Sequence, residues 1–219
     1  MGYGLSHSSV ASLVEHIALL QQNLRTWNGE TAFYHRYVKA LLNHPLVSRA
    51  ASTEAESLKE HILTYNRIVV PQSEIPDHPL LTMIFSPMTR WQEIGDYLHR
   101  IFSYLYHALT EEKNSDNFIE EKNEDKRSGG KEERKHVEEK DIKKRLRENE
   151  MDNLPSGNSR SLDLEREFLV QYYKTVTRLQ DRLSAAENMT VETWFRLLKK
   201  LAHSISLAFS GEPLSGLQV

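Results

Sequence analysis

The chain has 219 residues, no cysteine and a formal net charge of −3. This length is sufficient to bury a substantial core, and the lack of cysteine excludes disulfides and thiolate zinc sites and agrees with a cytoplasmic location. The near-neutral balance excludes a global electrostatic field that attracts nucleic acid, so a DNA contact would have to be local. No apolar run approaches the roughly 18 residues of a transmembrane helix, and we expect no membrane partner.

The first predicted helix runs from Ser8 or Ser9 to about Arg25. Its serines are candidate N-caps, and apolar residues recur at helical spacing on one face. This stripe consists of Val10, Leu13, Ile17, Leu20 and Leu24.

A turn at residues 27–29 leads to a second predicted helix over residues 30–43. Phe33, Tyr37, Val38 and Leu41 would lie on one side of it. Pro45 ends this helix, because the residue before a proline is pushed out of the α region.

The next segment is predicted to be mixed. Ser52 or Thr53 would cap a third helix over residues 54–66, with Leu58, Ile62 and Tyr65 facing inward. Beyond it, we expect a short extended piece at 68–71, a loop at 71–79 and a brief apolar helix at 80–85.

The clearest helix of the first half is predicted from Thr89 to about Glu111. Thr89 and Gln92 have the spacing of a capping box. The apolar residues that follow alternate at three and four positions, which predicts a core helix. They are Trp91, Ile94, Leu98, Ile101, Leu105 and Ala108.

Residues 111–160 form a charged insertion within this single domain. Acidic and basic side chains are nearly balanced there, and large apolar side chains are too few to offset the entropy of ordering the segment. We therefore expect a flexible surface insertion, with a solvated single helix at 131–150 as one alternative. An arm that contacts nucleic acid or a protein is the other, although phosphate binding requires net positive charge.

Two further helices are predicted after the insertion. An apolar stripe of Leu164, Phe168, Tyr172, Val176, Leu179 and Leu183 indicates a helix of about 25 residues from Ser161. The last helix has Thr190 as its N-cap, a hydrophobic staple of Met189 and Trp194, and an end at Ser210-Gly211-Glu212-Pro213. Residues 214–219 resemble the lead-in to a strand.

These elements predict an all-α fold, a bundle of about six helices with a long charged insertion. The sequence has no phosphate-binding glycine loop, no dinucleotide fingerprint and no nucleophile elbow. Its histidines are scattered, and none forms the i, i+4 pair of a helical zinc site. We therefore expect no catalytic, cofactor-binding or metal-binding residues in this chain.

The C-terminal residues carry a family resemblance. Residues 209–219, FSGEPLSGLQV, resemble a segment of AddB-like, PD-(D/E)XK nuclease family proteins of Bacteroidetes, in which F-x-G-E-P-L-x-G-L-Q enters the second RecA-like domain. Residues 191–198, VETWFRLL, are similar to the family's preceding helix.

The N-terminal residues resemble the same family. Met1-Gly2-Tyr3, followed by Leu5, is similar to the family's T-M-G-Y-P-L segment, which leaves the same RecA-like domain, although Gly4 stands where the family has proline. Residues 33–38 and 41–45 resemble the next stretch, a helix that ends in a leucine pair and N/H-P. The charged insertion matches no known pattern.

The resemblance implies a fragment: the helical 2B-like insertion between the two halves of the second RecA-like domain of a helicase–nuclease. ATP, a divalent metal and the nuclease carboxylates would then belong to other parts of the parent protein, a DNA helicase and exonuclease subunit of double-strand-break processing and recombinational repair. The implied partners are the rest of the parent chain, an AddA-like helicase subunit and double-stranded DNA.

This 2B-like module would guide duplex DNA or brace the partner subunit. The candidate DNA contacts are Arg196, Lys199 and Lys200 on the last helix, although we favour solvated cations on a polar helix face as the interpretation of these residues. An inserted module also predicts that Gly2 and Gln218 lie close together. The alternatives are a free-standing helical scaffold that binds other proteins and an enzyme whose cofactor site the motifs do not reveal.

Overall fold

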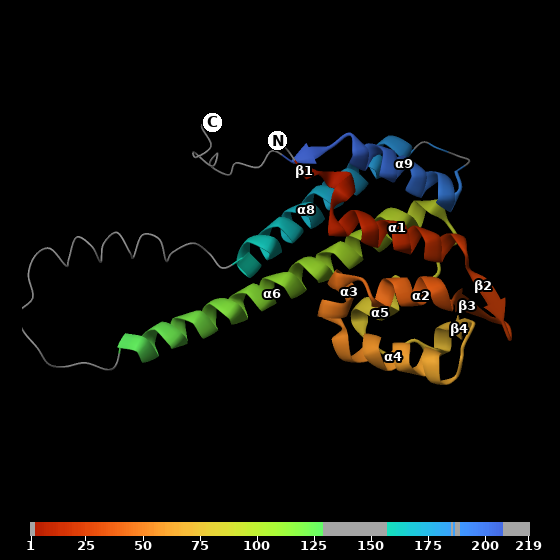
Figure 1. The fold of residues 1–219 in the computed structure, drawn as a ribbon. Coiled ribbons are helices and arrows are strands. Elements are labelled where there is room, and N and C mark those ends of the chain that lie inside the picture. Colours follow the sequence, from red (N-terminus) through yellow and green to blue (C-terminus); the bar gives the residue numbers. More distant parts are fainter. Residues whose placement is uncertain (1–2, 129–156, 185, 187–188, 208–219) are drawn as a thin grey trace, which may run out of the picture.

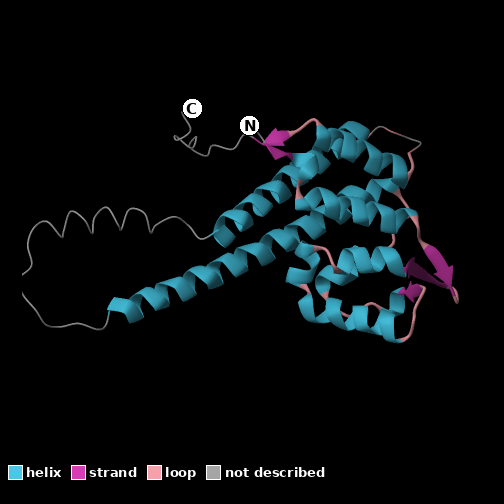
Figure 2. Ribbon diagram, viewed as in Figure 1, coloured by secondary structure: helices cyan, strands magenta, loops and turns pink. Residues whose placement is uncertain are grey.

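Helices make up most of the fold (Figures 1 and 2). A computed structural model of the chain describes residues 3–128, 157–184, 186 and 189–207. The described residues form eight α-helices, where the sequence predicts about six. They are α1 (Ser9–Gln22), α2 (His35–Leu42), α3 (Pro45–Ala50), α4 (Ser52–Thr64), α5 (Pro79–Ile84), α6 (Ile94–Ser128), α8 (Gly157–Leu183) and α9 (Val191–His203).

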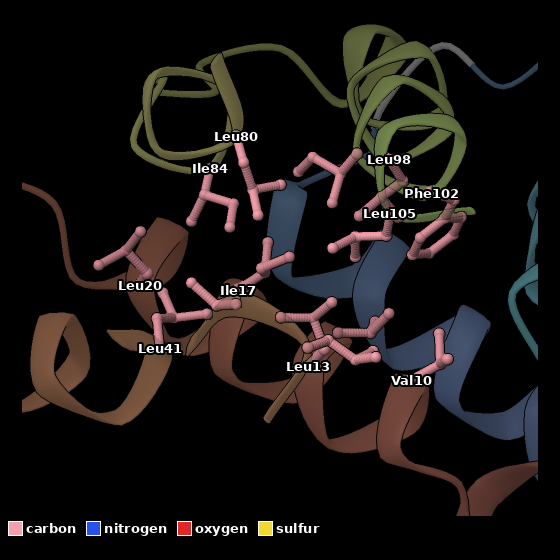
Figure 3. Close-up of a cluster of buried hydrophobic side chains, with 14 of the residues drawn as sticks. Val10, Leu13, Ile17, Leu20, Leu41, Leu80, Ile84, Leu98, Phe102 and Leu105 are labelled. Carbon is pink, nitrogen blue, oxygen red and sulfur yellow. The ribbon is translucent and has the colours of Figure 1, made fainter. Parts of the chain in front are cut away.

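Helix α1 lies at the centre of the hydrophobic core. It packs against α2, α3, α8 and α9. Its predicted stripe is buried at Val10, Leu13, Ile17 and Leu20, whereas Leu24 lies beyond the helix and is only partly buried. Figure 3 shows side chains of α1, α2, α5 and α6 that point toward one another. The predicted cap is confirmed, since Ser8 Oγ accepts a hydrogen bond from the Ala11 amide at 3.1 Å. The helix ends at Gln22, three residues before the predicted end.

A three-stranded antiparallel sheet shows that the all-α prediction is wrong in part. Its strands, in the order β2-β3-β4, are β2 (Arg25–Trp27), β3 (Glu30–Tyr34) and β4 (Val69–Pro71). The predicted turn between β2 and β3 is confirmed: Asn28 and Gly29 have φ values of 50° and 83°, as a two-residue hairpin turn requires. The short extended piece expected at 68–71 corresponds to β4.

The predicted helix over residues 30–43 is wrong in its first five residues. Glu30–Tyr34 is strand β3, and the helix begins only at His35. Phe33 lies opposite Val70 in the sheet, and both side chains are fully buried. Phe33 could be buried in a helix or in a strand, so its burial does not distinguish the two. Pairing with β2 and β4 makes this segment a strand.

Pro45 ends α2 as predicted, but it also begins a helix that the sequence analysis missed. Proline is favoured in the first helical turn, and the His44 imidazole caps α3 by accepting from the Leu46 amide at 3.3 Å. Helix α4 begins at Ser52 and ends at Thr64, close to the predicted bounds. The predicted cap is wrong, since Ala51 is the N-cap, and Tyr65 is 63% exposed rather than facing inward. Helix α5 confirms the brief apolar helix.

Helices α6 and α8 pack closely against each other (Figure 1). A Cβ at Gly95 would lie 1.9 Å from Gln180 Cδ, so a larger residue at this position would require the Gln180 side chain to move. The predicted capping box at Thr89 does not form: a 3₁₀ turn, Trp91–Glu93, precedes α6, which begins at Ile94. The apolar stripe of α8 is confirmed, with Phe168, Tyr172 and Val176 buried.

The two helices that flank the charged insertion are longer than predicted. Helix α6 continues to Ser128, well past Glu111, and α8 begins at Gly157. The backbone therefore remains helical over the first and last parts of the 111–160 segment. The solvated helix considered at 131–150 lies outside the described residues.

The two ends of the described chain meet in a second, two-stranded sheet. Strand β1 (Tyr3–Gly4) pairs antiparallel with β5 (Ser206–Leu207), with Tyr3 opposite Leu207. The Leu5 amide extends this contact by donating to the Ile205 carbonyl at 3.0 Å. The predicted end of the last helix at Ser210 is wrong, because α9 ends at His203 and β5 follows. Gly2, Gln218 and the strand expected at 214–219 lie outside the described residues.

Candidate interaction groove between α1 and α9

A hollow of about 250 Å³ lies between α1 and α9. Its floor is largely apolar, because both helices turn small or aliphatic side chains toward it and Tyr172 of α8 lies beneath. We call it the α1–α9 groove. Its apolar lining consists of Ala11, Val14, Ala18, Leu19, Tyr172, Phe195, Leu198 and Ala202.

The wall formed by α9 depends on a well-capped helix. Thr190 Oγ1 accepts from the Thr193 amide at 3.1 Å, as the sequence predicts. Trp194 is fully buried, and Met189 packs against the same core at the start of the helix. These contacts bury one face of α9 and leave its opposite face, with the predicted cations, in solvent.

The rim of the groove carries charges of both signs. Glu15 on α1 and Glu192 on α9 are acidic, and Arg196 and Lys199 on α9 are basic. Lys199 Nζ lies 2.8 Å from Glu15 Oε1, so an ion pair bridges the groove from one helix to the other. Both side chains are more than half exposed (59% and 56%), which limits the contribution of this pair to stability.

The phenol on the floor remains protonated. Burial raises the pKa of Tyr172 well above its usual range, and the nearby Glu15 carboxylate acts in the same direction. A phenol in this state cannot act as a base near neutral pH. The groove therefore offers shape, apolar area and rim charges, and Tyr172 contributes no base to it.

The three predicted DNA-contact residues divide between the groove and the outer surface. Arg196 and Lys199 line the groove, whereas Lys200 is exposed but lies outside its lining. Lys199 is neutralised by Glu15, while Arg196 and Lys200 form no ion pair with a described residue. The structure thus does not combine the three into one basic patch.

Trp194 has an unusual feature beneath the groove. Its indole Nε1 is buried and has no hydrogen-bond partner among the described residues. Buried donors are nearly always paired, and we have no physical account of this one. It does not line the groove.

Two buried polar side chains, Gln21 of α1 and Tyr97 of α6, bind backbone groups of residues 84–88. Gln21 donates to the Ser86 carbonyl at 2.9 Å and accepts from the Met88 amide at the same distance. Tyr97 donates to the Ile84 carbonyl at 2.7 Å, and burial raises its pKa well above the ordinary range. Each member is satisfied by backbone groups, as expected for a cluster that holds a loop.

Within the described ranges, no group of three or more His, Asp or Glu side chains is arranged to hold a metal ion. His44, the most buried histidine, bonds instead to Ser9, Ser12 and Leu46. None of the described helices combines the length and apolarity that crossing a bilayer requires.

No protein-family model, curated protein or solved structure matches this chain.

The sequence predicts α9 but not the groove. The predicted stripe of α1 faces the core, whereas Leu19 lies outside that stripe and is 37% exposed. An apolar residue off the main stripe, together with Ala11 and Ala18, was the available signal. It could not indicate which helix would lie opposite.

Proposed function

We propose that this chain is the non-catalytic, 2B-like helical module of an AddB-like, ATP-dependent helicase–nuclease that acts in DNA double-strand-break processing in the cytoplasm. The observation that carries the proposal is the pairing of β1 with β5. A module inserted into a host domain must leave and rejoin it at one place, and paired terminal strands supply such an entry and exit.

In this proposal, ATP hydrolysis and nuclease chemistry belong to the rest of the parent chain. The module's task is to guide DNA or to brace the host domain and the AddA-like subunit. The α1–α9 groove supports the bracing role, because an apolar floor between two helices with a rim of mixed charge suits an amphipathic helix of another protein.

The paired ends also define a clean experiment. Gly4 lies opposite Ser206. Residues 5–205 of this chain can therefore be replaced, within the parent protein, by a short Gly/Ser linker with little displacement of the host. We expect the shortened protein to retain ATP hydrolysis but to bind duplex ends or the AddA-like subunit at least tenfold more weakly. Unchanged duplex affinity, salt dependence and subunit association would refute the proposal.

A point substitution tests the groove itself. Leu19→Glu in the parent protein places a carboxylate on the apolar floor and should weaken subunit association. Leu63→Glu on α4 is the matched control, since Leu63 is 66% exposed and lies outside the groove. Equal effects of the two substitutions would remove the groove from the proposal.

A free-standing helical scaffold is the second candidate, and the same groove favours it. In that case the natural reading frame ends near Val219 and no RecA-like sequence flanks the module. Sequencing the locus separates the two candidates.

A further inference from the structure

The outer side of the α6–α8 pair carries two adjoining hollows of about 440 and 460 Å³. They share Ser103 of α6 and Tyr173 of α8, so they form one continuous surface, which we call the α6–α8 face. This surface is distinct from the α1–α9 groove, with which it shares no lining residue.

Among the residues whose side chains the structure describes, none that lines the α6–α8 face is acidic, although the chain as a whole is slightly acidic. Its charged lining consists of Arg100 and Lys174, one from each helix. Both are exposed, and neither forms an ion pair with a described residue.

Two acidic side chains of the same helices lie outside the lining of the two hollows. Asp96 accepts from Gln180 at 3.4 Å, and Glu167 accepts from Gln171 at 2.8 Å. Neither forms an ion pair with Arg100 or Lys174, so the two cations remain available to an anionic partner.

An aromatic pair lines the same face. The rings of His99 and Tyr173 stack with centroids 4.0 Å apart and an interplanar angle of 24°. Tyr173 is nevertheless 41% exposed, so the stacking fixes the ring while leaving part of it in solvent. Thr177 Oγ1 lies 3.2 Å from His99 Nε2 and further restrains the imidazole.

We propose that the α6–α8 face binds single-stranded DNA, with Arg100 and Lys174 on the phosphates and Tyr173 stacked against a base. Cations without acidic neighbours provide the charge complementarity, and a restrained, partly exposed ring provides a platform that every base can use. A stacked base must be unpaired, which selects a single strand over a duplex. The inference rests on the proposed function only for the choice of DNA as the nucleic acid.

The test is binding of a fluorescent thirty-nucleotide oligothymidine to the full 219-residue chain, followed by anisotropy over a salt series. Arg100→Gln with Lys174→Gln should lower the magnitude of the salt slope by about 1.4, since each phosphate contact of a single strand contributes about 0.7. Tyr173→Ala should weaken binding by about 5- to 150-fold. Tyr173→Phe retains the ring and should bind as the unsubstituted chain does.

The matched control is Arg25→Gln with Arg36→Gln, which removes two exposed cations that line neither the α1–α9 groove nor the α6–α8 face and should leave binding unchanged. Circular dichroism of each variant confirms that the helices are retained. No binding of oligothymidine by the unsubstituted chain, equal losses in test and control pairs, or tighter binding of a duplex of the same length would each overturn the inference.

These outcomes are separable from those of the proposed function. If the face binds no single strand, the module can still brace the AddA-like subunit through the α1–α9 groove. If the locus encodes a free-standing protein, loss of binding on substitution of Tyr173 still establishes the α6–α8 face.

Discussion

The α1–α9 groove and the α6–α8 face both combine apolar area with exposed cations, but their charges are organised differently. In the groove, Lys199 is bridged to Glu15, and Glu192 adds a second negative charge. On the α6–α8 face, none of the described residues that line the two hollows with Arg100 and Lys174 is acidic. The value of a surface cation for recognition therefore depends on the helix opposite it, and the number of lysines on one helix is a poor guide.

The largest expected effect comes from a residue that supports both surfaces. Phe102 is buried and packs edge-to-face against Tyr172, with ring centroids 6.1 Å apart. Phe102 lines the α6–α8 face and Tyr172 lines the groove. Phe102→Ala should reduce the free energy of unfolding by about 3–5 kcal/mol through lost burial and a cavity. Urea denaturation measures this loss.

The neighbouring Ser103→Ala is the control for this substitution. Ser103 is exposed, and its change should stay within about 0.5 kcal/mol. A loss below about 1 kcal/mol for Phe102→Ala would show that the two surfaces do not share this support.

The next effect is a pH dependence of stability that arises from His44, whose imidazole contacts Ser9 and Ser12 of α1. Burial lowers the pKa of His44 to about 4, and the nearby His16 acts in the same direction. The unfolded chain binds a proton with a pKa near 6.5, so it holds more protons than the folded chain between pH 4 and 6.5. Stability should therefore be complete above about pH 6.5 and fall as pH decreases to 4, by on the order of 2–3 kcal/mol.

The geometry explains why the charged imidazole is disfavoured. His44 Nδ1 accepts from the Leu46 amide, so a proton on this nitrogen removes the cap of α3. Nε2 faces the Ser9 carbonyl and the Ser12 hydroxyl. Urea midpoints measured from pH 4 to 7.5 should lose most of this slope in His44→Gln; an unchanged slope would assign the pH dependence to other groups.

A smaller effect separates the two surfaces. Thr190→Ala removes the cap of α9 and should cost about 1 kcal/mol. Because α9 forms one wall of the groove but no part of the α6–α8 face, hydrogen exchange should increase at the Thr193 amide and remain unchanged along α6. Thr190→Ser keeps the hydroxyl and is the control. Faster exchange along α6 would mean that the two surfaces are coupled.

The smallest effect concerns the ion pair across the groove. Lys199→Ala should change the free energy of unfolding by less than about 0.5 kcal/mol, because both partners are more than half exposed. A double-mutant cycle with Glu15→Ala measures the pair directly. A coupling energy above about 1 kcal/mol would indicate that this bridge, and not the apolar floor, holds α9 to α1.

The long helices could be predicted because their signals are local. Ser8 and Thr190 cap α1 and α9 as expected, and most residues of the stripes predicted for α1, α6 and α8 are buried. Thr89 shows the limit of such motifs. It has the spacing of a capping box, but the chain enters α6 through a 3₁₀ turn at Trp91–Glu93.

The sheet could not be predicted from the same signals. Residues 30–34 form a segment of only five positions, and their strand conformation depends on two partners, one of them more than 30 residues away at Val69–Pro71. Pro45 is a related case, because a proline that ends one helix also favours the start of the next. Only the cap from His44 shows that a new helix begins there.

The sequence by itself determined the helical character of the chain, its apolar stripes and the positions of several helix starts, since these depend on residues three or four positions apart. The tertiary structure decided the sheet, the pairing of β1 with β5, the groove opposite α1 and the acid-free α6–α8 face. Each of these features joins residues that are distant in sequence. Their contacts follow from how the helices pack, which spacing along one helix does not encode.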